Sequence, residues 1–246
     1  MPHLESLIVF TIGLVTCACT SRQTPGSGDN LADLRLLGPK ERVLQAKRRK
    51  AKYLQATAEH AGLPYPVPAM YFRAFKKEAV LEAWGAAHSD GPFRLIKIYA
   101  IAAMSGGLGP KRKEGDRQVP EGLYQINRFN PASRFLLSLG LDYPNASDRI
   151  LSDQVRPGGD IFIHGDRVSI GCLAMTDDKI MEIYTLADGA RAKGQATIRV
   201  DVFPSRKPSS SPLAESLAPF AVEFDRTKSV PSFKVLRNGA YKLVKS

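Results

Sequence analysis

Short runs of β-branched and aromatic residues, separated by turn-forming loops, limit the fold of this 246-residue chain more than any other feature. Such runs favour strands. They cover residues 69–75, 93–103, 122–126, 160–164 and 197–203. Helical patterns are few and do not alternate regularly with these runs. The sequence therefore predicts a β-rich α+β domain with an antiparallel or mixed sheet, not a doubly wound parallel sheet.

Three segments have apolar residues at helical spacing and are predicted to be helices: 39–60, 76–84 and 176–190. The first carries a basic run of five residues: Lys47, Arg48, Arg49, Lys50 and Lys52. Such a run is typical of a solvated face or, if the protein is exported, of contact with anionic lipid or wall polymer. We expect no nucleic-acid partner.

Composition narrows the class of protein. The chain is 43% hydrophobic and 24% charged, as in ordinary globular proteins, which excludes a wholly disordered chain and a multi-span membrane protein. Its 35 Lys and Arg residues exceed the 24 Asp and Glu residues, for a formal net charge of +11. A surplus of this size favours polyanionic surroundings without choosing among them.

The N-terminus contains an unbroken apolar run from Leu7 to Val15. A spanning helix needs about 20 residues, so this run is too short to cross a bilayer and has the length of a signal-peptide core. Cys17 or Cys19 follows as in a bacterial lipoprotein signal, and lipidation of either would anchor the protein to the membrane. The leader has no Lys or Arg and carries Glu5, so a buried apolar segment stays an alternative.

Four regions follow from these patterns: a signal peptide or lipoprotein signal at residues 1–19, a tether with the basic helix at 20–67, a main domain at 68–204, and a Ser/Pro linker with a C-terminal tail at 205–246. The exported domain would be periplasmic.

A strand-turn-helix pattern at residues 161–183 carries most of the chemical signal. We expect Cys172 just before a helix N-terminus, where the helix dipole lowers a thiol pKa. His164 comes from the preceding strand of a hairpin-like turn and could pair with the thiol as a base. The amides around Gly171 and Cys172 could form an oxyanion hole. A buried, inert Cys172 is the alternative. No second Cys or His stands at ligand spacing, so neither a metal nor another cofactor is expected.

The pattern HGxxxSxGCxAM, which begins at His164, resembles the active-site signature of YkuD-type L,D-transpeptidases, bacterial cysteine enzymes that act on peptidoglycan. The continuation AMTD is closest to the YafK-like branch. The resemblance covers roughly residues 68–204, and its upstream motifs are SG at 105–106, LGPK at 108–111, EGDRQ at 114–118, PEG at 120–122 with Tyr124, NP at 130–131, and YPNA at 143–146 with DR at 148–149. It implies a β-sandwich-like YkuD catalytic domain with a few helices.

The resemblance also implies a reaction. Cys172 would attack the diaminopimelate carbonyl of a stem peptide, and His164 would act as general acid and base. A thioester would then pass to an amine or to water. The Gly165 carbonyl would orient the His164 ring. Two departures are that Ile170 replaces the second His of many members, and that Ala102 and Ala103 replace the Cys and Trp of the branch.

Further residues are predicted to bind substrate. Arg117, Glu121 and Tyr124 belong to the motif that precedes the catalytic strand in the family, and Ser169 lies in the catalytic turn. A salt-bridge cluster that stabilises the loop is an equal reading of the first three. The YafK-like resemblance leans towards hydrolysis, including release of wall-linked lipoprotein, whereas the wider family favours transfer. A wall-binding module without turnover is a further alternative.

Overall fold

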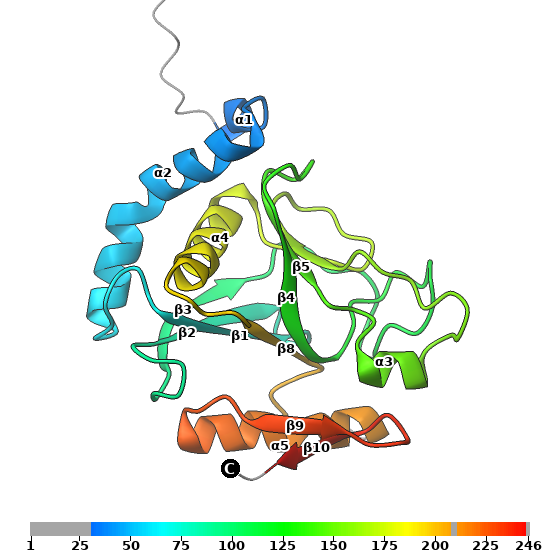
Figure 1. The fold of residues 1–246 in the computed structure, drawn as a ribbon. Coiled ribbons are helices and arrows are strands. Elements are labelled where there is room, and N and C mark those ends of the chain that lie inside the picture. Colours follow the sequence, from blue (N-terminus) through cyan, green and yellow to red (C-terminus); the bar gives the residue numbers. More distant parts are fainter. Residues whose placement is uncertain (1–30, 208–210, 245–246) are drawn as a thin grey trace, which may run out of the picture.

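A mixed, curled β-sheet forms the centre of the protein in a computed structural model, which describes residues 31–207 and 211–244 (Figure 1). The sheet order is β3-β2-β1-β8-β4-β5-β6-β7, with β1/β8 and β6/β7 parallel and the other pairs antiparallel. The strands are β1 Ala69–Phe75, β2 Val80–Ala86, β3 Arg94–Ala100, β4 Gly122–Asn130, β5 Ser138–Leu141, β6 Phe162–His164, β7 Leu173–Ala174, β8 Arg199–Phe203, β9 Ser232–Val235 and β10 Tyr241–Val244. The predicted fold class is confirmed.

Helices cover both faces of this sheet. They are α1 Leu31–Leu34, α2 Pro39–His60, α3 Ala146–Leu151, α4 Asp177–Ala192 and α5 Pro212–Thr227. Figure 1 shows α4 against one face with α2 outside it, and α5 with the β9–β10 hairpin against the other face. The main core lies under α4, where Ile180, Ile183 and Ala187 have no exposed surface. Of the described helices, none is both long enough and apolar enough to cross a membrane.

The predicted helix at 76–84 is wrong. Residues 80–86 form β2, which pairs antiparallel with β1 from Ala69↔Ala86 to Phe75↔Val80. Both faces of β2 are covered, so Leu81 and Trp84 are buried on opposite sides of the sheet. Apolar residues on both faces remove the alternation that marks a half-buried strand, and the remaining pattern imitates a helix.

The basic helix is a packed part of the domain. α2 lies on α4, and two of its lysines pair with acidic residues there: Lys47 with Asp188 at 2.5 Å and Lys50 with Glu182 at 3.2 Å. The expectation of a solvated basic face therefore does not hold for these two side chains. The predicted leader and the first part of the tether, residues 1–30, lie outside the described residues.

The C-terminal tail is also folded, in contrast to the loosely patterned segment that we expected. α5 buries Leu217, Phe220 and Phe224 against the sheet. Phe224 lies 4.8 Å from Tyr71 and 5.0 Å from Trp84 between ring centroids. The apolar residues of the C-terminal tail are spread over one helix and one hairpin, so each element alone has little surface to bury. Only the sheet supplies the surface against which they pack.

This packing predicts that α5 stabilises the central sheet. Phe224→Ala should lower the free energy of unfolding by about 3–5 kcal/mol, because it leaves a cavity between aromatic rings. Val222 is 67% exposed on the same helix, and Val222→Ala should change that free energy by less than about 0.5 kcal/mol. Urea unfolding followed by circular dichroism measures both. Equal effects of the two substitutions would contradict the packing role of α5.

Candidate active site

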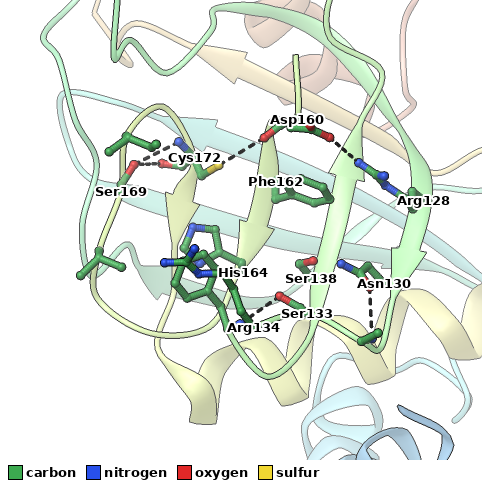
Figure 2. Close-up of a pocket in the computed structure, with 14 residues that line it drawn as sticks. Arg128, Asn130, Ser133, Arg134, Ser138, Asp160, Phe162, His164, Ser169 and Cys172 are labelled. Carbon is green, nitrogen blue, oxygen red and sulfur yellow. Dashed lines mark hydrogen bonds and ion pairs between the residues drawn. The ribbon is translucent and has the colours of Figure 1, made fainter. Parts of the chain in front are cut away.

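His164 and Cys172 lie on one face of the sheet because of the register of two short strands. β6 and β7 are parallel, with Ile163 opposite Leu173 and His164 opposite Ala174. Alternate residues of a strand point to the same face, so Phe162, His164 and Cys172 share a side. Figure 2 shows these three side chains around one pocket. The parallel pairing replaces the hairpin-like turn that the sequence predicted.

The His164 ring is held from two directions. Its Nδ1 lies 2.5 Å from the Gly165 carbonyl oxygen, and because a carbonyl only accepts, the Nδ1 atom carries the proton. Phe135 stacks on the other side at 4.4 Å between ring centroids. His164 is 2% exposed, and burial lowers its pKa although Gly165 and Asp166 act in the opposite direction. The resting ring is therefore neutral at pH 7, with Nε2 free of a proton.

Gly165 is required by the close approach of neighbouring atoms. A Cβ at this position would lie 2.5 Å from both Asp177 Oδ1 and the Phe135 carbonyl oxygen. Any side chain would thus push apart the turn after β6 and the loop that carries Phe135.

Cys172 is a partly buried thiol beside a backbone carbonyl. Its Sγ donates to the Asp160 oxygen at 3.6 Å. Burial raises the pKa of the Cys172 thiol, with a further increase from Asp160, while the Phe162 backbone and Lys111 lower it. The predicted helix does begin close to Thr176, at Asp177, but β7 lies between it and Cys172, so the thiol does not lie directly before the helix N-terminus as we expected. The resting group is a thiol, not the thiolate that the sequence suggested.

Ser169 closes the turn before Cys172. Its Oγ accepts from the amides of Gly171 at 3.2 Å and Cys172 at 3.0 Å, and donates to the Cys172 carbonyl at 2.7 Å. Gly171 has φ +133°, a conformation that few other residues adopt. The two amides named as an oxyanion hole are therefore adjacent to the thiol but bonded to a hydroxyl in this state.

These groups face a cavity of about 890 Å³. Besides His164 and Cys172, its lining consists of Arg128, Asn130, Ala132, Ser133, Arg134, Phe135, Ser138, Asp160, Phe162, Val168, Ser169 and Ile170. The volume suits a peptide segment. Sequence reasoning did not single out Arg128, Phe135 or Asp160, whose only signal was their closeness to the Asn130-Pro131 motif and the catalytic strand.

Three predicted substrate residues do not line this cavity. Glu121 and Tyr124 are each 1% exposed. Glu121 pairs with Lys76 at 3.0 Å and accepts from the Gly109 amide at 2.7 Å, which fits the loop-stabilising reading. Arg117 is exposed on the loop whose Gln118 carbonyl packs against Gly171. Of the four predicted substrate-binding residues, Ser169 alone lies among the lining residues.

Comparisons with known proteins identify the family of this chain. The YkuD model, described as the L,D-transpeptidase catalytic domain, matches residues 90–202. The Escherichia coli (strain K12) protein named "Putative L,D-transpeptidase YafK" is 34% identical over 184 residues, which cover 70% of this chain and 72% of that protein. The protein of the same name from Escherichia coli O157:H7 has the same identity and coverage.

Two solved structures are among the matches to this chain. The helical cell shape determining protein Pgp2 from Campylobacter jejuni matches with 21% identity and a TM-score of 0.44, over 64% of this chain and 54% of that one. Bd1075 from Bdellovibrio bacteriovorus matches with 17% identity and a TM-score of 0.41, over 65% and 55%. This chain thus spans about half of the length of each. By its family match and its identity to YafK, the chain belongs to the YkuD family of L,D-transpeptidase catalytic domains.

Proposed function

We propose that this protein is a periplasmic cysteine enzyme that acts on peptidoglycan stem peptides through a thioester on Cys172. The observation that carries the proposal is the shared face of β6 and β7, which places a neutral imidazole and a thiol in one cavity. The family acts on peptidoglycan, and the net charge of +11 suits an anionic wall. Export by the apolar leader, with lipidation of Cys17 or Cys19, would bring the domain to this substrate.

The reaction begins from uncharged groups. As Sγ attacks the diaminopimelate carbonyl, Nε2 of His164 takes the thiol proton, and Nδ1 keeps its bond to Gly165. The imidazolium then returns the proton to the amine of the departing D-Ala, which leaves a thioester on Cys172. An acceptor amine or water then attacks the thioester. His164 takes the proton of the attacking group and returns it to the departing Cys172 sulfur, which restores the thiol. The neutral resting state requires this transfer to accompany the attack.

The developing oxyanion would bind the amides of Gly171 and Cys172. Ser169 Oγ now accepts from both, so it must turn aside, or be replaced, as the tetrahedral intermediate forms. An oxyanion attracts the two N–H groups more strongly than a neutral hydroxyl does. Ser169 would thus keep the amides aligned in the empty site, without reacting itself.

Hydrolysis is a second outcome that a specific observation favours. Val168 is 53% and Ile170 is 79% exposed at the cavity edge, so this edge presents apolar side chains where an acceptor amine would need a polar partner. Water needs no such binding site. Hydrolysis would trim the stem peptide or release a wall-linked lipoprotein. The name of the Escherichia coli relative, a putative L,D-transpeptidase, supports transfer instead.

Cys172→Ala should abolish turnover while the protein stays folded. Loss of the attacking atom should reduce the rate by about 10³-fold or more, and alanine fits the partly buried space. Mass spectrometry of muropeptides after incubation measures turnover, and unfolding curves check stability. Undiminished product from the folded variant would refute the nucleophile assignment.

The pKa directions predict two pH responses. Alkylation of Cys172 by iodoacetamide without substrate should have its midpoint above about pH 8.5, since a raised pKa keeps the thiol protonated up to a higher pH.

Turnover should fall on the acid side only below about pH 6.5, where His164, with its lowered pKa, becomes charged. His164→Ala should slow acylation by about 10²–10⁴-fold and remove this acid limb. Activity within a fewfold of the parent would place the base elsewhere.

The fate of the thioester should be visible in the products. A tetrapeptide donor alone, and with excess diaminopimelate-bearing acceptor, should yield mainly trimmed tripeptide in both mixtures, because the apolar edge does not hold an amine. Mass spectrometry distinguishes the products by mass. New dimers linked between two diaminopimelates, without tripeptide, would reject hydrolysis and leave transfer.

A further inference from the structure

We propose that Arg128 binds a carboxylate of the donor peptide, and that the side chain of Asp160 occupies this subsite while the cavity is empty. The inference rests on the proposed function and adds a specificity-determining residue to it. Figure 2 shows the arrangement, with Asp160 between Cys172 and Arg128. Nothing in the sequence motif indicated these two residues.

The guanidinium of Arg128 is oriented towards the cavity by an aromatic ring. Its central carbon lies 4.7 Å from the ring centroid of Phe162. Phe162 lies beside Cys172 on the shared face of β6 and β7, so the same ring is next to both Arg128 and the proposed nucleophile. Stacking on a ring leaves the N–H edges of a guanidinium free to bind a carboxylate, often with two parallel hydrogen bonds.

Asp160 contacts both the nucleophile and the arginine. Its backbone carbonyl accepts from Cys172 Sγ at 3.6 Å, and its carboxylate accepts from Arg128 Nη2 at 2.7 Å. The residue has φ +52°, an unfavourable conformation for a residue with a side chain, although Asn and Asp tolerate it better than most. The carboxylate of the protein thus already marks the position of a negatively charged group next to the thiol.

This internal pair can be displaced. The side chains of Arg128 and Asp160 are 54% and 82% exposed, and ion pairs with such exposure contribute little to stability. A peptide in the cavity would exclude water from Arg128, which strengthens its interaction with a carboxylate. The exchange therefore costs the protein little and favours a bound, negatively charged donor.

The proposed donor carries a second carboxylate beyond the carbonyl that Cys172 would attack. In diaminopimelate, about 7 Å separate the attacked carbonyl carbon from the carboxyl carbon at the end of an extended side chain. In the empty site Asp160 bridges the two groups, with its backbone carbonyl 3.6 Å from Cys172 Sγ and its carboxylate 2.7 Å from Arg128 Nη2. Arg134, exposed on the same cavity wall, adds positive potential. The C-terminal carboxylate of the departing D-Ala is the other carboxylate of the donor that could bind Arg128.

Binding to the full chain carrying Cys172→Ala tests the inference without requiring turnover. Isothermal titration would use three tetrapeptides: the free acid, one amidated at the diaminopimelate side chain, and one amidated at the C-terminus. Adding Arg128→Gln should weaken binding of the free acid about tenfold, the loss of one charge-assisted pair. Arg128→Gln should not affect binding of the peptide whose recognised carboxylate is amidated. The peptide that is unaffected therefore shows whether Arg128 binds the diaminopimelate carboxylate or the C-terminal one.

Two further variants complete the test. Asp160→Asn keeps the size and tolerates the backbone angle, and it should tighten binding of the free acid severalfold by releasing Arg128. Arg156, which pairs with Glu114 at 2.7 Å and is not among the cavity-lining residues, supplies the matched control, and Arg156→Gln should leave binding unchanged.

The inference would be overturned if Arg128→Gln behaved like Arg156→Gln, or if all three peptides lost affinity equally. Unchanged or weaker binding by Asp160→Asn would refute the internal occupancy. Failure of the proposed function has a different signature: the parent would show no turnover, while Arg128-dependent binding to the Cys172→Ala protein would persist.

Discussion

The parallel pairing of β6 and β7 determines how His164 and Cys172, the proposed catalytic pair, lie relative to each other. These strands have three and two residues, so few ladder hydrogen bonds hold them. Neighbouring contacts supply the rest: the Met175 amide donates to the His164 carbonyl at 2.8 Å, and Ala174 forms a bridge with Ala103. A shift of one residue in this register would turn Cys172 to the opposite face of the sheet. The chemistry therefore depends on backbone interactions around two very short strands.

The walls of the cavity are supported from outside the region that matches the family model. Arg35 pairs with Asp166 at 3.2 Å, on the turn that follows His164, and with Asp177 at 2.8 Å, at the start of α4. Arg42 donates to the carbonyls of Ser133 at 2.7 Å and Leu136 at 3.3 Å, on the loop that stacks Phe135 against the catalytic ring. The segment before β1 is thus a structural part of the active site and not only a tether.

A neutral thiol and a neutral imidazole would suit the proposed periplasmic enzyme, because the periplasm is an oxidising compartment. Thiolates react with oxidants and disulfides far more readily than thiols do. Burial that raises the pKa of Cys172 and lowers that of His164 delays the formation of the reactive species until a carbonyl is in place. Under the proposed mechanism, Cys172 would thus stay an unreactive thiol until a substrate carbonyl is bound.

Patterns of a few neighbouring residues were sufficient to predict part of this structure. Helix α2, strand β1 and the strand nature of residues around His164 followed from local periodicity, and the HGxxxSxGCxAM pattern singled out His164 and Cys172. Residues 76–84 did not follow, because a strand that is covered on both faces loses the alternation that identifies it. The C-terminal α5 and hairpin did not follow either, because their apolar residues have no partner until the sheet has formed.

The sequence by itself determined the family and its candidate nucleophile and base, because these are encoded in contiguous motifs. Tertiary structure alone decided their protonation states, through burial by distant segments, and the composition of the cavity. Arg128, Phe135 and Asp160 come from three separate segments, and Glu121 and Tyr124 turn inward although they stand in a family motif. Which side chains meet depends on strand register and on the packing of helices against the sheet, and these long-range contacts leave no local pattern in the chain.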